Sequence, residues 1–313
     1  MYIRKAGRQS VYRSRRIANF TGAFSQPGRA QKAIAFARVG VTLHDMPPAL
    51  IWPGPSMPSS PGINGKMKGL AVLLVAFLIL TSIIVTPTFA GPPFLTDDPE
   101  PVPFKHWEVY LFSTVDATRR CISGTGPACE FNVGALPNLQ AHLILPLAFT
   151  APQDEPGAFG LGDMEFGLKY RFIQETDHRP MAGVFPLLEI PTGDANRGLG
   201  NGQAWGKLPL WLQKSWGPWT TYGGGGYAIN PAPEQRSYYF GGWLLQRDIG
   251  ERLTLGGEIF SQGKSSDDIR SFAVFNLGGF FKITPNFQIL FSGGHTLAGG
   301  NHTIAYLGLY WTG

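Results

Sequence analysis

The sequence predicts an all-β protein, an antiparallel transmembrane β-barrel of about 12 strands that follows a cleaved signal peptide. Apolar and polar residues alternate with a period of two over the last two thirds of the chain, as in strands with two different faces. An apolar segment with the order of an export signal precedes this region. Charged residues make up only 15% of the chain, against about 25% in an average soluble domain, as expected for an outer surface that faces lipid.

Residues 1–66 form a basic extension that predicts no fold. They hold ten Lys and Arg side chains against one acid, Asp45, and are rich in Pro and Gly. Such a composition cannot bury enough apolar surface to fold, so we expect this part to be disordered. The basic arm indicates an overextended start, with Met67 as the true first residue. The alternative is a cytoplasmic or nucleic-acid-binding tail.

Residues 67–90 have the features of a secretory signal peptide. Met67 and Lys68 give a short positive start, residues 69–85 carry no charge, and Pro87 is followed by Thr88-Phe89-Ala90, with small residues at both positions that a signal peptidase reads. The alternative is a transmembrane anchor, but the apolar stretch is shorter than the roughly 20 residues that a helical span needs. We therefore expect cleavage after Ala90.

The predicted mature chain consists of a periplasmic N-terminal segment, 91–106, and the barrel, 107–313. Residues 91–313 carry 15 basic and 20 acidic side chains, a net charge of −5, whereas the whole chain has 26 and 21, a net charge of +5. The positive balance thus belongs to the part that precedes the mature chain, and no nucleic-acid partner is expected.

The clearest strand pattern runs from Asp163 to Phe172. Every even position is apolar and every odd position is charged or Gly, so a strand would separate the two kinds and a helix would mix them. The same alternation gives twelve candidate strands, at about 107–116, 130–136, 138–149, 162–172, 180–191, 203–216, 218–229, 236–247, 251–262, 269–282, 286–297 and 301–311.

Connections of two lengths alternate between these strands, which favours a membrane barrel over a soluble sandwich. One end has tight turns, such as 137–138 and 284–285, and the other has longer loops, such as 117–129 and 192–202. Aromatic residues near strand ends are expected to form the interfacial girdles: Trp107, Trp205, Trp216, Trp219, Tyr238 and Trp311.

The cost of charge in lipid decides which face points inward. A Lys or Arg at the bilayer midplane costs roughly 2–4 kcal/mol, so the charged face should line the lumen. The expected lumen-lining residues are Asp163, Glu165, Lys169, Arg171, Glu189, Arg252 and Glu258. Whether they surround a narrow path or a closed plug of side chains stays open at this stage.

The two cysteines, Cys121 and Cys129, fall in one predicted external loop. In an oxidising compartment we expect them to form a disulfide. The alternative, a metal pair, has no nearby His, and the histidines of the chain lack ligand spacing. No metal site and no cofactor are predicted.

The stretch Gly160–Phe172, with the sequence GLGDMEFGLKYRF, and the stretch Glu189–Asp194, EIPTGD, resemble the bacterial outer-membrane family named for the meta-pathway of phenol degradation. The resemblance covers most of 91–313. It implies an outer-membrane barrel whose members are commonly called transporters, for hydrophobic or aromatic small molecules. One departure is the last residue, Gly313, where such barrels usually end in Phe for recognition by the assembly machinery.

These observations predict a transporter or porin-like barrel in the outer membrane of a Gram-negative bacterium. Its expected partners are outer-membrane lipid, the barrel-assembly machinery and small hydrophobic solutes. Two alternatives stay open, a structural or adhesive barrel with a plugged lumen and a lipid-modifying enzyme. No catalytic residues and no enzyme are predicted, because Leu143-Ile144 follow His142 where a barrel phospholipase carries its Ser, and no Gly-x-Ser-x-Gly motif occurs.

Overall fold

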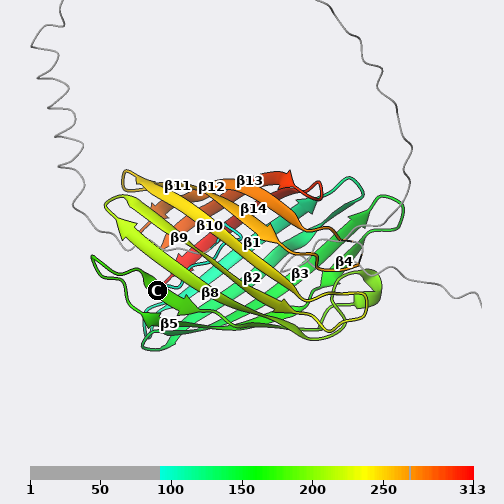
Figure 1. The fold of residues 1–313 in the computed structure, drawn as a ribbon, viewed down its shortest axis with the longest axis horizontal. Coiled ribbons are helices and arrows are strands. Elements are labelled where there is room, and N and C mark those ends of the chain that lie inside the picture. The colour runs from blue at the N-terminus through cyan, green and yellow to red at the C-terminus, as the bar shows by residue number, and fades with distance from the viewer. Residues whose placement is uncertain (1–91, 268) are drawn as a thin grey trace, which may run out of the picture. The chain divides into compact units, whose positions relative to one another are not determined.

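The structure, a computed structural model, describes residues 92–267 and 269–313. The predicted disordered extension 1–66 and signal peptide 67–90 lie outside these residues, so their boundaries stay predictions. The described residues form a closed antiparallel β-barrel of 12 strands, which cross the barrel obliquely in Figure 1. No helix in the described part of the chain is long and apolar enough to span a membrane.

Fourteen strand segments build these 12 strands, because β4–β5 and β6–β7 are each one strand with an interruption. Their bounds are β1 Trp107–Ala117, β2 Cys121–Leu136, β3 Leu139–Pro152, β4 Ala158–Leu161, β5 Met164–Ile173, β6 Met181–Val184, β7 Leu187–Ile190, β8 Trp205–Trp216, β9 Trp219–Ile229, β10 Tyr238–Ile249, β11 Leu253–Gln262, β12 Phe272–Thr284, β13 Phe287–Ala298 and β14 Thr303–Thr312.

Neighbours in sequence pair throughout, and the first and last strands close the ring. β1 pairs with β14 over ten residue pairs, from Glu108 opposite Thr312 to Ala117 opposite Thr303. β3 pairs with both β4 and β5, and both β6 and β7 pair with β5 on one side and β8 on the other. Closure leaves no free sheet edge apart from that of the short β4, which pairs with β3 alone, as a structure in lipid requires.

The two interruptions have local causes. Between β6 and β7 lies Pro186, which has no N–H to donate to a neighbouring strand. Backbone hydrogen bonds from Leu168 to the Pro186 carbonyl and from Phe185 to the Pro209 carbonyl hold the gap in the wall. Between β4 and β5, Gly162 and Asp163 leave the ladder, and the carboxylate of Asp163 turns to a neighbouring loop.

Alternation along each strand separates a lipid-facing surface from the lumen, as predicted. In β5 the side chains of Glu165 and Lys169 are each 5% exposed, whereas Leu168 between them is 52% exposed. In β12 the fractions are 1% for Asn276 and 62% for Leu277. Charged groups therefore point inward and an apolar belt surrounds the barrel, which is the arrangement of an outer-membrane barrel.

Connection lengths agree with the prediction except after β1 and β3. The expected connection between 149 and 162 is reduced to 153–157, because β3 runs to Pro152 and β4 begins at Ala158. Tight turns follow β2, β8, β10 and β12, and the longer connections include 191–204, which holds the short 3-10 helix η1 (Ala195–Arg197). The predicted loop at 117–129 is wrong, since β2 begins at Cys121 and only 118–120 connect it to β1. Gly and Thr between 123 and 126 hid this strand from the apolar pattern.

The predicted disulfide between Cys121 and Cys129 is also wrong, and both thiols are free. The two residues lie in the same strand, so about 20 Å or more separates their Cα atoms, whereas a disulfide needs less than about 7 Å. Cys121 points inward, with its Sγ 3.4 Å from Oγ1 of Thr150 in β3.

Only part of the predicted aromatic girdle faces lipid. Trp107 and Trp216 are 45% and 49% exposed at the end of the tight turns, where Trp219 and Trp311 are partly exposed. Trp205 and Tyr238 lie instead at the opposite end and point inward, where they are buried with Ala228 in one cluster. Nearness to a strand end does not decide whether an aromatic side chain faces the lipid or the lumen. Alternate residues of a strand point to opposite faces, so the position of the residue within that alternation decides.

Candidate functional site

Residues 92–102 lie inside the barrel, although the sequence placed this segment in the periplasm. The backbone N–H groups of Leu95 and Thr96 donate hydrogen bonds of 2.8 and 2.7 Å to the carboxylate of Glu258 in β11. The hydroxyl of Ser292 in β13 donates to the carbonyl of Pro93 at 2.7 Å. One end of the segment is thus fixed to the wall formed by β11 and β13.

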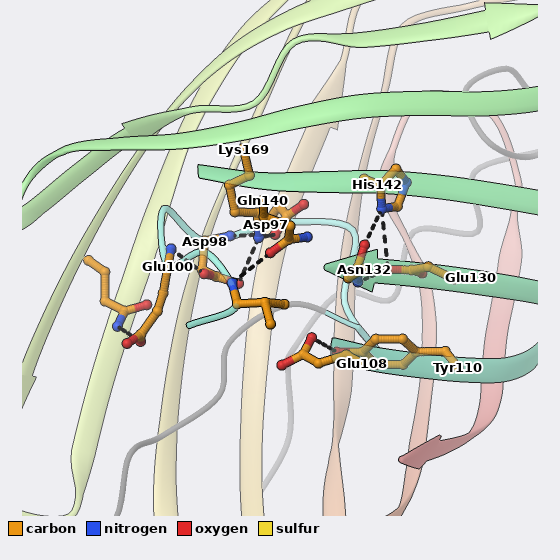
Figure 2. A network of polar contacts seen from close by, with 12 residues as sticks. Asp97, Asp98, Glu100, Glu108, Tyr110, Glu130, Asn132, Gln140, His142 and Lys169 are labelled. Atoms are coloured by element: carbon orange, nitrogen blue, oxygen red, sulfur yellow. Dashed lines mark hydrogen bonds and ion pairs between the residues drawn. The ribbon is translucent and has the colours of Figure 1, made fainter. Parts of the chain in front are cut away.

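The other end of the segment is fixed to the opposite part of the wall (Figure 2). The ammonium group of Lys169 in β5 lies 3.0 Å from Asp97 Oδ1 and 3.4 Å from Asp98 Oδ2. The N–H of Val102 donates to the side-chain oxygen of Gln140 in β3 at 2.9 Å. The segment therefore crosses the lumen and constricts it.

Glu100 is the remaining acid of the crossing segment. Its Oε2 accepts a hydrogen bond of 3.3 Å from Gln213, and its Oε1 lies 3.9 Å from the guanidinium of Arg171. Burial raises the pKa of the Glu100 carboxyl above its ordinary value, and Gln213 and Arg171 oppose that shift.

A chain of polar contacts runs along the adjacent wall from β2 to β8. Asn132 donates to Glu130 Oε1 at 2.8 Å, and His142 Nδ1 lies 2.7 Å from Asn132 Oδ1 (Figure 2). On its other side, His142 Nε2 lies 3.2 Å from Glu165 Oε1, and Lys207 donates to Glu165 Oε2 at 3.4 Å. Both ring nitrogens of His142 face acceptor oxygens, an arrangement that the doubly protonated imidazolium satisfies.

Glu108 in β1 is held differently, by hydroxyl groups. Tyr110 and Tyr310 donate to its two carboxylate oxygens at 3.0 and 2.9 Å. The two tyrosine rings lie 4.7 Å apart, and Glu108 is 7% exposed. This acid therefore stands at the border between the polar chain and an aromatic part of the wall.

A cavity of about 310 Å³ lies between the crossing segment and the wall. The carboxylates of Glu108 and Glu130 line one side with Asn132 and His142. Apolar and aromatic side chains line another: Phe94, Leu95, Tyr110, Phe112, Ile144, Ile304 and Tyr306. The rings of Phe112 and Tyr306 stack at 5.3 Å. The cavity thus combines an acidic side with an aromatic side.

The structure brings together most of the residues that the sequence proposed for the lumen. Glu165, Lys169, Glu189 and Glu258 are buried on its inner face, and Arg171 is partly buried there. Two residues lie elsewhere. The carboxylate of Asp163 accepts hydrogen bonds from the backbone of Gly193 and Asn201, and so anchors the long loop. Arg252 is exposed in the turn before β11, one residue before the wall begins.

Sequence reasoning missed Asp97, Glu108, Glu130 and His142. For Glu130 and His142 a signal existed, because each lies between outward apolar neighbours in a candidate strand. For Glu108 the signal was weak, since both faces of β1 carry aromatic residues. For Asp97 there was none, because its segment has no periodicity and its position depends on tertiary contacts alone.

One solved structure shares this fold. The chain is similar to the COG4313 outer membrane channel from Pseudomonas putida F1, with a TM-score of 0.57, 16% identity, and coverage of 72% of this chain and 100% of that one. It also aligns with the NanC porin, at a TM-score of 0.47, 6% identity and coverage of 65% and 98%, and with the CymD monoaromatic hydrocarbon channel, at 0.34, 9%, 67% and 88%.

The curated proteins give no match. The family described as "Putative MetA-pathway of phenol degradation" matches residues 121–311, which include all strands from β2 to β13 and most of β14. This confirms the resemblance carried by Gly160–Phe172 and Glu189–Asp194. The chain belongs to this family of outer-membrane β-barrels.

Proposed function

We propose that the protein is a channel in the outer membrane of a Gram-negative bacterium, through which small hydrophobic or aromatic molecules pass. The observation that carries the proposal is the lumen cavity of about 310 Å³ with its aromatic side. A cavity of about 150 Å³ already holds benzene in an engineered protein. A single aromatic ring would therefore fit beside the crossing segment.

The rest of the barrel supports transport rather than catalysis. The apolar belt would contact outer-membrane lipid, and insertion would depend on the barrel-assembly machinery. The polar groups of the lumen are engaged with one another, as in the pairs Lys169–Asp97 and Lys207–Glu165. Such a lumen offers a lined path for a solute. The name of the COG4313 protein, an outer membrane channel, fits the same proposal.

A second candidate is a structural barrel with a plugged lumen. The hydrogen bonds of the crossing segment to Glu258, Ser292 and Gln140 favour it, because they tie residues 93–102 to both sides of the wall. In a channel this segment would have to leave room or move. In a plug it would stay in place.

Permeability measurements separate the two candidates. The purified barrel is inserted into planar bilayers for conductance, and into vesicles for uptake of a small neutral aromatic solute such as benzyl alcohol. We expect solute uptake above that of protein-free vesicles. In Glu258→Ala, the N–H groups of Leu95 and Thr96 lose their acceptor, so we expect conductance to rise severalfold.

Glu258→Gln serves as the graded comparison, because its size is unchanged and its amide oxygen keeps one acceptor, while its NH2 group cannot accept the second hydrogen bond. It should raise the conductance less than Glu258→Ala does. A barrel that passes neither ions nor benzyl alcohol, with Glu258→Ala as tight as the parent, would instead establish the plugged barrel.

A further inference from the structure

The charge of the lumen cavity, as well as its volume, limits which ligands can bind, because its charged groups are mostly acidic. We propose that it is a binding site for small aromatic molecules that bear a hydrogen-bond donor and are neutral or cationic, and that it excludes aromatic carboxylates. This inference rests on the proposed channel function and adds the substrate class to it.

Five carboxylates line the cavity against two basic groups. The acids are Asp97, Glu100, Glu108, Glu130 and Glu165, and the basic groups are Lys169 and His142. Lys169 lies within 3.4 Å of both Asp97 and Asp98, and His142 lies 3.2 Å from Glu165. The positive groups are therefore held by acids. Lys207 and Arg171 lie near Glu165 and Glu100, so Glu108 and Glu130 are the acids whose negative charge an incoming carboxylate would meet.

Glu130 provides the acceptor for a donor group. Its side chain is 8% exposed, and Oε1 accepts from Asn132 and lies 3.5 Å from His142. Both of these contacts involve Oε1, and Glu130 lines the cavity. An ammonium or hydroxyl group in the cavity could therefore donate to the second carboxylate oxygen, Oε2.

Asn276 is a second acceptor at the cavity. It is 1% exposed, and its amide group donates to Glu258 at 2.9 Å, which fixes the amide orientation. Its Oδ1 is buried without a hydrogen-bond partner among the described residues, and the residue lines the cavity. Glu130 and Asn276 thus both present acceptor oxygens, which favours a ligand that donates a hydrogen bond over a carboxylate.

The aromatic side of the cavity would take the rest of the ligand. Tyr110 and Phe112 of β1 face Ile304 and Tyr306 of β14 across the first and last strands of the ring, with Ile144 beside them. These side chains offer apolar contact and ring faces, and the ring faces also attract a cation. The ligand class is therefore one ring with one polar group at its edge.

Three probes with the same ring and different charge test this inference: benzylamine as the ammonium ion, benzyl alcohol and benzoate. Binding to the folded full-length barrel in detergent is measured at neutral pH by titration calorimetry, and uptake of each probe is measured in vesicles. We expect benzylamine and benzyl alcohol to bind, and benzoate to bind at least about tenfold more weakly, as like charges require.

Glu130→Gln should reduce the ratio between benzylamine and benzoate affinity severalfold, because it removes one negative charge without changing the shape. Glu108→Gln, in the neighbouring strand β1, provides a second test if the first variant does not fold. Glu251→Gln is the matched control, since Glu251 is exposed in the turn before β11 and does not line the cavity. It should leave the ratio unchanged.

The two proposals fail in different ways. Equal binding of the three probes, or preferred binding of benzoate, overturns the charge preference even if all three enter vesicles. Selective binding of benzylamine and benzyl alcohol without any uptake would refute the channel and leave the binding site standing. A ratio that Glu130→Gln and Glu108→Gln leave unchanged would also overturn the inference, since these acids would then not face the ligand.

Discussion

The lumen has two unlike walls, and they hold the crossing segment by different means. The charged wall, the inner faces of β2, β3, β5 and β8, consists of ions and amides in contact, among them Glu130, His142, Glu165 and Lys169. The apolar wall, the inner faces of β11, β12, β13 and β14, carries Phe260, Phe272, Val274, Phe280, Leu290, Ile304 and Tyr310. Here Glu258 is the only carboxylate that the described residues place among the apolar side chains.

The inward face of this barrel is thus polar on one side and largely apolar on the other. On the charged wall each group is fixed by a specific partner, so removing one partner leaves a buried charge. On the apolar wall many weak contacts act together. Truncating one side chain there lowers the free energy of unfolding through the apolar burial that is lost and the cavity that is left behind. The two walls should therefore respond differently to substitution.

The largest effect is expected on the charged wall, from Lys169→Met. This change leaves Asp97 and Asp98 without their ammonium partner inside the barrel, and breaking a buried pair from one side costs about 3–5 kcal/mol of unfolding free energy. Denaturant titration in detergent micelles, followed by tryptophan fluorescence, measures it.

Adding Asp97→Asn and Asp98→Asn to Lys169→Met should recover most of the loss, because no unpaired charge then remains. Lys264→Met, at an exposed position, is the control and should change little. A loss that persists in the triple variant would mean that Lys169 acts through packing, for example on the Phe185 ring, which its ammonium overlies at 4.9 Å.

A somewhat smaller effect is expected on the apolar wall, from Phe272→Ala. Phe272 is 2% exposed and belongs to the cluster with Phe260, Val274 and Ile304. Truncating a buried Phe costs about 3 kcal/mol. Phe275→Ala in the same strand is the matched comparison, because Phe275 is 38% exposed on the lipid face.

The same denaturant titration decides between the two phenylalanines. We expect a clearly smaller loss for Phe275→Ala, since lipid or detergent fills the space that the ring leaves. Equal losses would indicate that the inner cluster is not packed more tightly than the lipid face, and the contrast between the walls would reduce to charge alone.

The two walls also differ in how far the sequence predicted them. In β5 the outward residues are apolar and the inward ones are charged, so the alternation shows both the strand and its orientation. In β12 both faces carry large apolar residues, as with Phe272 inside and Phe275 outside, and Asn276 is the buried polar residue of the inner face. There the alternation assigns the faces by fewer polar positions than in β5. All 12 strands were predicted, yet the aromatic side of the cavity was not.

The position of the crossing segment inside the lumen could not be predicted, for a different reason. Its position depends on contacts between residues far apart in the sequence, such as Leu95 with Glu258 and Asp97 with Lys169. No local pattern encodes these contacts. The predicted disulfide was wrong for a local reason. It assumed a loop between Cys121 and Cys129, whereas both cysteines lie in strand β2.

The smallest expected effect concerns the pH dependence of the crossing segment, through Glu100→Gln. Burial raises the pKa of Glu100 above its ordinary value of 4.5, so the folded protein binds this proton more readily than the unfolded chain does. The contribution of the group to stability is therefore present below pH 4.5 and is lost as the pH rises through the folded-state pKa. At pH 8 the ionised carboxyl is a cost, which the neutral amide does not carry.

We accordingly expect Glu100→Gln to be slightly more stable than the parent at pH 8, by less than about 1 kcal/mol because the side chain is partly exposed and water screens its charge. The difference should disappear as the pH falls toward 4.5. Denaturant titrations at pH 8, 6 and 4.5 measure it, with Glu251→Gln as an exposed control. A variant less stable than the parent at pH 8 would show that the contact with Arg171 at 3.9 Å outweighs the cost of burial, and that ionised Glu100 helps to hold the crossing segment on the charged wall.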